Sequence, residues 1–270
     1  MDIACERIFK AILDEDRISI FGDYDVDGST STSILVNYFR QISINLDFHI
    51  PDRFTEGYGP SINSFSKFKS QNTNVIITVD CGTMAHSEIA YANQQGMDVI
   101  VLDHHLPEIS LPEAKAIINP NRIDDTSGLN YLAAVGVTFM LTVGLNRKLR
   151  DEGWFEKKLL KEPNLIELLD LVALGTICDA VPLKGVNRIL VSKGIDVIHK
   201  RLNPGLKSLI EVSKIKSKVS VYDLGFKIGP RINAGGRLGY SSFGTELLTE
   251  SDKYKIDSLT TVSYTHLTLP

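Results

Sequence analysis

The sequence of 270 residues lacks several features that would each indicate a particular class of protein. Its three cysteines are far apart and form no C-x-x-C pair, which argues against a disulfide-rich secreted fold and a thiolate zinc site. It contains no run of about eighteen apolar residues, and charges interrupt the N-terminal segment where a signal peptide needs an apolar core. We therefore expect a cytoplasmic protein with reduced thiols.

An excess of positive charge is also absent, because the formal net charge is −4. Attraction of the whole molecule to nucleic acid or to an anionic membrane is therefore not predicted. A bound metal ion or a locally basic groove can still supply the positive charge that an anionic substrate needs. The 43% hydrophobic and 23% charged residues are typical of a globular chain with one large domain or two smaller ones.

Apolar, β-branched runs alternate with helix-like segments over roughly the first hundred and twenty residues. The strand-like runs are 17–21, 44–50, 74–80, 98–105 and 114–120, and the helix-like segments lie around 32–40, 62–69 and 87–95. This alternation predicts an α/β fold with a doubly wound, mainly parallel sheet flanked by helices. The segments 131–153, 163–181 and 187–202 predict a following helical layer, and 208–220 is expected to be a solvated loop.

The stretch FGDYDVDGSTSTS places Asp23, Asp25 and Asp27 at alternate positions, followed by Gly28. Carboxylates this close repel one another unless a cation or a proton lies among them. An EF-hand calcium loop would need a glutamate at its twelfth position and a helix before the loop. The twelfth position is Ile34, and the preceding RISIF predicts a buried strand. We interpret the stretch as an acidic turn, in which Gly28 has an unusual backbone conformation, leading into a helix.

Three further acidic or histidine-containing segments follow predicted strands or a predicted helix. Asp80 ends one strand-like run, the triplet 103–105 ends the next, and Asp179 follows a helix-like segment. A single aspartate there is usually a cap or turn residue, but parallel strands bring their carboxyl ends to one edge of a sheet. Mixed carboxylate and imidazole ligands suit manganese, magnesium or zinc. Two ions about 3.5 to 4 Å apart, bridged by an aspartate, would activate water for in-line attack on phosphorus.

The ordered stretches GDYDVDG, VDCGT, LDHH and LGTICDAVPL resemble the DHH phosphoesterase superfamily. Within it, PDRFTEGYG, INPNR, LAAVGV and FKIGPRINAGGRLG are similar to the RecJ family of single-stranded-DNA-specific 5′ to 3′ exonucleases. The resemblance covers the chain from Asp2 to about Leu259. It implies the DHH phosphoesterase fold, hydrolysis of single-stranded DNA with a free 5′ end, a role in DNA repair and recombination, and Mn²⁺ or Mg²⁺ as cofactor, with two ions.

The resemblance also implies roles for particular side chains. Asp80 would bridge two metal ions, Asp23 would be a neighbour of the site, and Asp103 would orient a histidine through a hydrogen bond. These residues and the remaining ligands form the expected catalytic site. The implied metal ligands are Asp25, Asp27, Asp80, His104, His105 and Asp179, and Asp103 joins them as a catalytic residue.

The segment GPRINAGGRLG is a candidate phosphate-binding loop. Arg231 and Arg237 offer paired donors for phosphate oxygens, and Asn233 can donate a further hydrogen bond. Gly235 and Gly236 would let the backbone approach a ligand. The alternative is an ordinary surface turn rich in glycine.

The segment PDRFTEGYG supplies two more candidates for substrate contact. Arg53 would contact phosphate and Tyr58 would stack on a base. The alternative is that both residues only shape the loop.

From the resemblance we expect three segments. Residues 1–200 form the catalytic α/β domain, and 201–259 complete the catalytic lobe. Residues 260–270, TTVSYTHLTLP, show no continuing periodicity and are expected to be a non-native or disordered tail. The DHHA1-type and OB-type domains found in RecJ-like proteins are expected to be absent from this chain. The resemblance is compatible with a helicase or a single-strand-binding protein as partner. It does not predict the oligomeric state.

Two other functions remain as alternatives. The first is a DHH-family phosphodiesterase for oligonucleotides or cyclic dinucleotides, or a pyrophosphatase. Such relatives usually carry a histidine four residues before the first motif aspartate, and here Phe21 stands four residues before Asp25. The second is an inactive scaffold similar to Cdc45, which has lost metal ligands. All six ligand positions are filled here, so the sequence favours the exonuclease.

Overall fold

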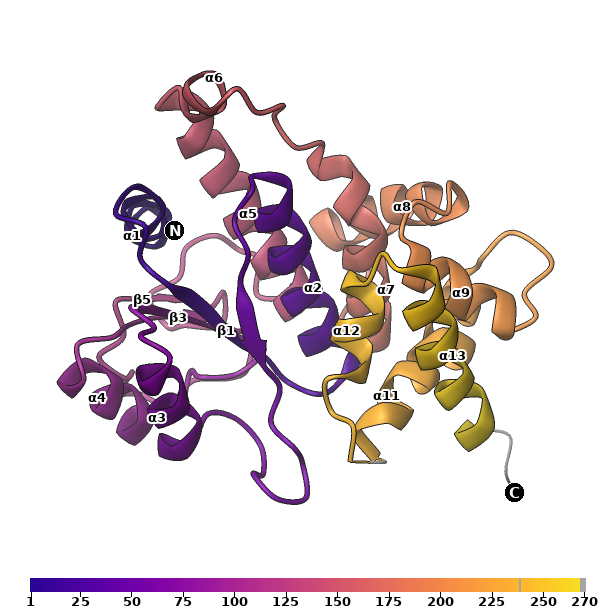
Figure 1. Cartoon of the computed structure of the whole chain (residues 1–270), viewed down its shortest axis with the longest axis horizontal. Coiled ribbons are helices and arrows are strands. Elements are labelled where there is room, and N and C mark those ends of the chain that lie inside the picture. Colours follow the sequence, from indigo (N-terminus) through magenta and orange to yellow (C-terminus); the bar gives the residue numbers. More distant parts are fainter. Residues whose placement is uncertain (238, 268–270) are drawn as a thin grey trace.

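Five parallel strands form the central sheet in the computed structural model, which describes residues 1–237 and 239–267, with the side chains of 237 and 262–267 left out (Figure 1). The strands are β1 (Ile18–Phe21), β2 (Asp47–His49), β3 (Val75–Val79), β4 (Asp98–Leu102) and β5 (Ala116–Ile118). Their order in the sheet is β2-β1-β3-β4-β5, and every neighbouring pair is parallel. Each strand lies within a run that the sequence predicts, so the predicted α/β fold with a parallel sheet is confirmed.

Helices cover both faces of this sheet (Figure 1). One face packs against α1 (Asp2–Leu13), α2 (Val26–Gln41) and α5 (Ala134–Asp151), and the other against α3 (Ile62–Ser70) and α4 (His86–Gln94). Residues along the central strands alternate between the two apolar clusters: Ile77 and Ile100 belong to the first, and Ile76 and Val99 to the second. Burial on both faces explains why β3 and β4 are continuous apolar runs.

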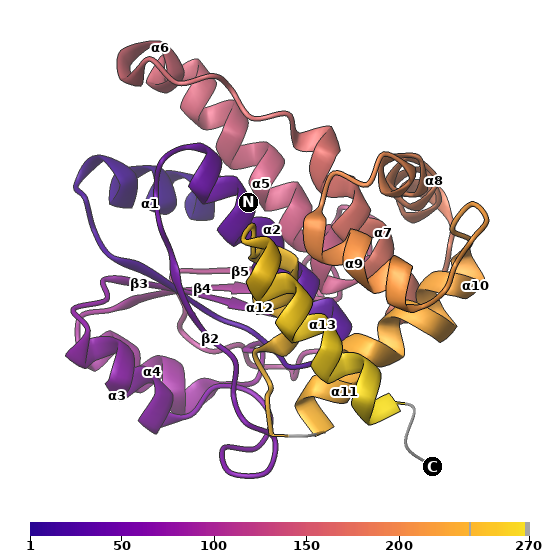
Figure 2. The ribbon, with the colours of Figure 1, turned by 45° about the vertical axis from the view of Figure 1, so that its right-hand side comes forward.

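A helical layer packs on the side of α2 and α5 that faces away from the sheet, as Figure 2 shows. Its helices are α7 (Leu169–Cys178), α8 (Gly185–His199), α9 (Pro204–Val212), α11 (Gly229–Arg237), α12 (Phe243–Thr249) and α13 (Lys253–Leu267). Two short elements, α6 (Trp154–Lys158) and the 3₁₀ helix η1 (Leu165–Leu168), connect α5 to α7, and α10 (Val221–Asp223) and the π-helix η2 (Leu224–Ile228) connect α9 to α11. Across the described ranges, none of these helices combines the length and apolar character needed to cross a membrane.

Two expectations for the second half of the chain are wrong. The segment 208–220 is helical as far as Val212, so only its later part is a loop. The segment expected to be a glycine-rich loop forms helix α11 up to Arg237. A Cβ on Gly235 would lie 2.5 Å from Cβ of Phe243, so this glycine allows α11 to pack against α12. Close packing of helices, rather than approach to a ligand, therefore accounts for Gly235.

The end of the described chain also differs from expectation. Helix α13 continues to Leu267, whereas the loss of periodicity predicted an end near residue 259. Thr260 is buried, and its hydroxyl lies 2.9 Å from that of Ser208 on α9. Contacts with α9 thus stabilise a segment whose own pattern does not predict a helix. Residues 268–270 of the expected tail lie outside the described residues.

Candidate metal centre

The predicted acidic and histidine side chains converge at one edge of the sheet. Because β1, β3 and β4 are adjacent and parallel, the residues that follow them share this edge. The residues Asp23, Asp25 and Asp27 follow β1, Asp80 follows β3, and Asp103, His104 and His105 follow β4. Asp179 reaches the same place from the C-terminal end of α7. The strands and α7 therefore bring together side chains separated by more than a hundred residues.

The acidic turn is the start of α2. Asp25 is its N-cap, and its Oδ1 accepts a hydrogen bond of 2.9 Å from the Gly28 amide. Gly28 is helical, so the unusual backbone conformation expected for it is wrong. A Cβ at Gly28 would lie 2.5 Å from the carbonyl oxygen of Asp23. The glycine is required because the preceding turn folds closely onto the first turn of the helix.

Two helices hold the carboxylate of Asp27. Its Oδ2 accepts a hydrogen bond of 2.7 Å from the amide of Ala134, and its Oδ1 one of 2.9 Å from that of Val135. These are the first two residues of α5, where a helix presents free amides and a partial positive charge. A Cβ on Gly175 of α7 would lie 3.1 Å from Oδ1. The position of this buried carboxylate is therefore fixed by packing as well as by hydrogen bonds.

His104 lies at the centre of the cluster. Its Nε2 is 3.4 Å from Oδ1 of Asp80, 3.7 Å from Oδ2 of Asp179 and 3.8 Å from Oδ2 of Asp27. Three groups of side chains place their candidate ligand atoms within 4.8 Å of one another. The groups are Asp80 with His104 and His105, Asp27 with His104 and Asp179, and Asp23 with Asp25 and Asp80. Asp80 and His104 each belong to two groups, so the groups form one continuous cluster.

Asp103 holds the histidine pair in place. Its Oδ1 lies 2.7 Å from Nδ1 of His105 and accepts the amides of His104 and His105, while Oδ2 accepts the amide of Thr83. Although burial alone would raise it, the hydrogen bond from His105 brings the pKa of Asp103 down to about 2. The carboxylate is thus ionised and can only accept. Nδ1 of His105 is therefore the donor, which leaves Nε2 as its second functional atom.

The pKa values of Asp23, Asp27, Asp80 and Asp179 are shifted in the opposite direction. Burial, then the charge of Asp25, raises the pKa of Asp23 to about 7 and that of Asp179 to about 6. Burial and neighbouring carboxylates raise the pKa of Asp27 and of Asp80 far above the usual range. Within the described part of the chain, Oδ1 of Asp23 and Oδ2 of Asp179 are buried without a hydrogen-bond partner. Crowded carboxylates with unpartnered oxygens are what a divalent cation would compensate, so these residues fit a metal site.

Thr83, Asn119 and Asn121 support the site although the sequence does not predict this role for them. Nδ2 of Asn119 donates to the Thr83 hydroxyl at 3.0 Å and to the carbonyl of His105 at 2.8 Å. Asn121 donates to the carbonyl of His104. Both asparagines follow β5 at the same edge of the sheet, in the stretch INPNR. Two asparagines at a strand end were the available signal, since parallel strands bring such positions together.

The predicted substrate-contact loop lies beside this cluster. The guanidinium carbon of Arg53 is 5.7 Å from the ring centroid of Tyr24, which stands between Asp23 and Asp25. The hydroxyl of Tyr58 donates to the carbonyl of Asp80 at 3.1 Å. The Tyr58 ring is edge-on to His105 at 6.0 Å and remains 57% exposed. The loop therefore borders the cluster and leaves one aromatic face accessible.

Helix α11 carries the other predicted substrate residues. Arg231 and Asn233 are partly buried on this helix, and Oδ1 of Asn233 has no hydrogen-bond partner among the described side chains. A Cβ on Gly236 would lie 3.6 Å from Cβ of Tyr24, so the end of α11 is adjacent to the acidic turn. The approach of the backbone to a ligand at Gly236 stays a prediction. The side chain of Arg237 lies outside the described residues.

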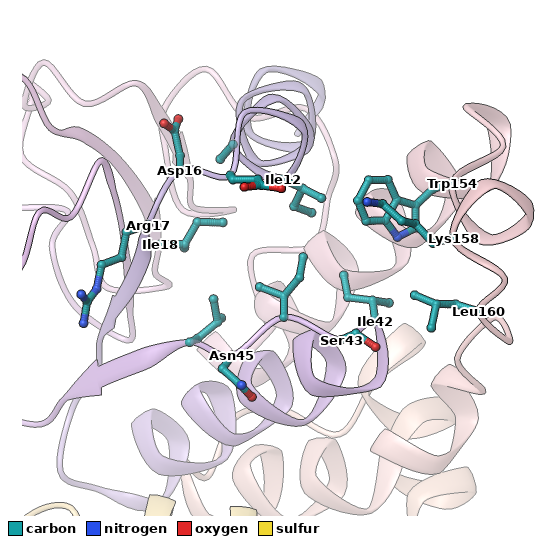
Figure 3. A pocket seen from close by; sticks show the side chains of 14 residues that line it. Ile12, Asp16, Arg17, Ile18, Ile42, Ser43, Asn45, Trp154, Lys158 and Leu160 are labelled. Carbon is teal, nitrogen blue, oxygen red and sulfur yellow. The ribbon is translucent and has the colours of Figure 1, made fainter.

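A cavity of about 550 Å³ lies far from the acidic cluster (Figure 3). It is bordered by the C-terminal ends of α1 and α2 and by residues in and beyond α6, including Trp154, Lys158 and Leu160. Ile18, the first residue of β1, lines it, whereas Asp23 follows the last residue of that strand. The cavity and the cluster are therefore at opposite ends of the sheet.

The fold and site define an α/β protein with a carboxylate and imidazole cluster at the C-terminal edge of a parallel sheet. The family described as "DHH family, N-terminal domain" matches residues 17–176, which is more than half of the chain. The chain belongs to the DHH family.

Relatives within this family are similar over most of the chain. The "Single-stranded-DNA-specific exonuclease RecJ" of Salmonella typhimurium is 44% identical over 92% of this chain, which corresponds to 44% of that protein. RecJ of Bacillus subtilis is 38% identical over 96% of this chain and 31% of its own length. The crystal structure of "exonuclease RecJ bound to manganese" has a TM-score of 0.85 at 32% identity, over 97% of this chain and 64% of that one. The chain spans less than half the length of these two curated relatives.

Proposed function

We propose that this chain carries the catalytic site of a metal-dependent phosphodiesterase that hydrolyses single-stranded DNA from its 5′ end. The observation that carries this proposal is the convergence of buried aspartates and two histidines from four separated segments, with carboxylate oxygens left without partners. The RecJ relatives, named as exonucleases specific for single-stranded DNA, supply the substrate class.

We propose Mn²⁺ or Mg²⁺ as the cofactor, with two ions. Hard oxygen ligands mixed with imidazole suit manganese best and magnesium next. Asp80 belongs to two of the candidate groups and is the proposed bridge. The proposed ligands are Asp25, Asp27, Asp80, His104, His105 and Asp179. Bound ions supply an activated water and offset the negative charge that develops on the phosphate during hydrolysis.

Hydrogen bonds within the chain position the proposed ligands. Asp103 accepts a hydrogen bond from Nδ1 of His105 and so leaves Nε2 as the nitrogen without a proton, which could bind an ion. Asn119 and Asn121 bind the carbonyls of the histidine pair, which fixes the backbone at this point. Asp23 lies within the cluster and shares in the charge that the ions offset. These positioning residues reduce the reorganisation needed when substrate arrives.

Substrate contacts are proposed for the loop and helix that border the cluster. Arg53, Arg231 and Arg237 would donate to phosphate oxygens, and Asn233 would add a further hydrogen bond. Tyr58 would stack on a base with its exposed ring face. The position of Arg53 beside the acidic turn supports this proposal.

Two accompanying proposals concern the surroundings of the chain. A helicase or a single-strand-binding protein that exposes unpaired strand would suit this substrate. A cytoplasmic location agrees with the three cysteines, all of them free thiols in the described residues.

The test compares substrates of the candidate functions under one set of conditions. A 5′-phosphorylated single strand, the matching duplex, a dinucleotide, a cyclic dinucleotide and pyrophosphate are each incubated with Mn²⁺, Mg²⁺ or EDTA. We expect fastest hydrolysis of the single strand, with mononucleotides released from the 5′ end, and none in EDTA. Preference for the cyclic dinucleotide or pyrophosphate, or hydrolysis that persists in EDTA, would overturn the proposal.

A further inference from the structure

Two aromatic side chains form an exposed stack on the helical layer. Tyr222 of α10 is 62% exposed and Phe226 of η2 is 71% exposed. Their ring centroids are 4.9 Å apart and their planes differ by 25°. Single exposed apolar residues are common on protein surfaces, but two stacked rings present a continuous aromatic face. Such a face can accept a further flat ring.

The surroundings of this pair carry more positive than negative charge. The segment 211–227 contains four lysines and two acidic residues. Lys214, Lys216 and Lys218 are exposed and lead into Ser220, the N-cap of α10. Lys227 pairs with Asp223 at 2.6 Å and lies 5.9 Å from the Tyr222 ring centroid. Lysines interleaved with exposed aromatic rings complement a polyanion with flat bases.

The element that carries Phe226 packs directly on the helix that delivers Asp179. Sγ of Cys178, the last residue of α7, lies 3.6 Å from the carbonyl of Leu224 in η2. A Cβ on Gly229, which follows η2, would lie 2.5 Å from the same sulfur. Figure 2 shows the chain passing from α10 into α11 along the lower edge of the helical layer. The backbone that carries Phe226 is therefore packed against the end of the helix that leads into Asp179.

The backbone at this point is also unusual. η2 is a π-helix, a rare conformation that is found mostly as single turns and often at functional sites. The wider turn carries Phe226 and lies between Tyr222 and the start of α11, the helix with the proposed phosphate contacts.

We propose that Tyr222 and Phe226 form a base-stacking site for single-stranded nucleic acid, which holds the strand beside the metal centre. The inference rests on the proposed function, since the strand that is held is the one to be hydrolysed. Stacking on aromatic rings tolerates any base, which suits a nuclease that must move along a sequence of any composition.

Binding without hydrolysis tests this site. Fluorescence anisotropy with a labelled oligothymidylate of about 15 nucleotides is measured in EDTA, so that no cleavage occurs. Loss of one stacked base should weaken binding about tenfold in Phe226→Ala and in Tyr222→Ala. Phe226→Trp should bind as the original chain does, because it keeps an aromatic face. Phe226→Leu should be as weak as Phe226→Ala, because it keeps only the apolar character.

Matched controls separate this site from the rest of the surface. Tyr254 of α13 is 85% exposed, so Tyr254→Ala removes an equally accessible ring elsewhere and should leave binding unchanged. Because Tyr222 and Phe226 are exposed, their variants should unfold at the original temperature. Manganese-dependent hydrolysis of a dinucleotide should also be unchanged, since that substrate needs only the metal centre.

Two outcomes would overturn the base-stacking site. Full binding by Phe226→Leu alongside weak binding by Phe226→Ala would show that the face prefers any apolar group, as a protein docking surface does. Unchanged binding in all three of Tyr222→Ala, Phe226→Ala and Phe226→Leu would place the strand elsewhere. Failure of the proposed function is distinguishable, because it would appear as preference for another substrate or as hydrolysis in EDTA, neither of which the anisotropy experiment measures.

Discussion

Asp80 has a backbone φ of +60°, a left-handed conformation that most side chains avoid. Aspartate and asparagine adopt it more readily than other residues because their short side chains can bond locally. The carbonyl of Asp80 accepts the Tyr58 hydroxyl, and its carboxylate lies among other buried acids. Backbone strain and buried charge thus coincide at the proposed bridge, as they often do at functional sites.

Asp80→Asn should separate function from folding. The amide keeps the left-handed backbone but cannot serve as an anionic bridge, so we expect manganese-dependent hydrolysis to fall at least about a hundredfold. Without metal the variant should be more stable at neutral pH, by about 1 kcal/mol or more, because the raised pKa of Asp80 in the folded state lowers stability there and the amide does not titrate. Activity assays and thermal unfolding in EDTA measure the two effects. Near-normal turnover in the variant would exclude Asp80 as a metal ligand.

Arg53→Ala should weaken substrate capture and leave metal binding intact. A charge-assisted hydrogen bond to phosphate contributes about 1.5 to 3 kcal/mol, so kcat/KM should fall roughly ten- to a hundredfold. Calorimetric titration with Mn²⁺ is the control and should give the affinity of the original chain. A lost manganese affinity would instead mean that Arg53 supports the acidic turn through Tyr24.

Asp170 gives a pH-dependent prediction away from the metal centre. Burial raises its pKa to about 7, whereas an unfolded aspartate has about 3.9. The folded state therefore holds a proton more tightly, and the free energy of unfolding falls as pH rises from about 4 to about 7. Asp170→Asn keeps an acceptor for the Leu171 amide and stays neutral. It should be more stable than the original chain at pH 8, by at most about 4 kcal/mol, and by less at pH 5.

Urea unfolding of both proteins at several pH values measures this difference. The acidic cluster titrates in both, so its contribution cancels in the comparison. The exposed Asp257→Asn is the matched control and should give no such trend. A stability difference that is the same at pH 5 and pH 8 would contradict the prediction.

Among the elements, the contact between α7 and α2 sets the position of Asp27. Gly175 lies at this contact, and a Cβ there would be 2.3 Å from Oγ1 of Thr30 and 2.8 Å from Cγ1 of Val135. Gly175→Ala should therefore force the helices apart and destabilise the fold by about 1 to 3 kcal/mol. Hydrolysis should fall as well, since Asp27 Oδ1 would be only 3.1 Å from the new carbon.

The double variant Gly175→Ala with Thr30→Ala tests the steric cause. Removing Oγ1 of Thr30 should restore part of the lost stability, because the two changes share one contact. Gly225→Ala is the control, since its Cβ would meet only Ile177 at an ordinary 3.5 Å. No recovery in the double variant would assign the loss to another contact.

The sequence predicted the sheet well because its strands are short, continuous and buried on both faces. It predicted the cluster because residues after parallel strands share an edge. It could not predict α11, since Gly, Pro and Asn disfavour helices and the contact of Gly235 with Phe243 stabilises this one. The end of β5 indicated that Asn119 lies near the cluster, but its hydrogen bond to Thr83, 36 residues away in the chain, could not be predicted.

For the whole molecule, a net charge of −4 limits the affinity for a long DNA strand, because few phosphates can be neutralised. The proposed phosphate contacts are few and lie near the metal centre. We therefore expect this chain, assayed alone, to cut single-stranded DNA slowly with Mn²⁺ and to release it after a few cuts, with little activity on duplex. An excess of unlabelled trap strand added after binding measures the run length. Long digestion in the presence of trap would contradict this expectation.

The carboxylate of Asp27 binds the first two amides of helix α5. Both carboxylate oxygens accept amides of α5, so the fold needs this acid even if hydrolysis is no longer under selection. Asparagine would be a poor substitute, because its NH₂ group would face a backbone amide. In a lineage that abandoned catalysis, Asp179 and His104 would be free to drift, whereas Asp27 would be retained. An aspartate at this position in a descendant protein therefore indicates common ancestry only. Retention of the other proposed ligands, such as His104 and Asp179, would indicate that the descendant still hydrolyses its substrate.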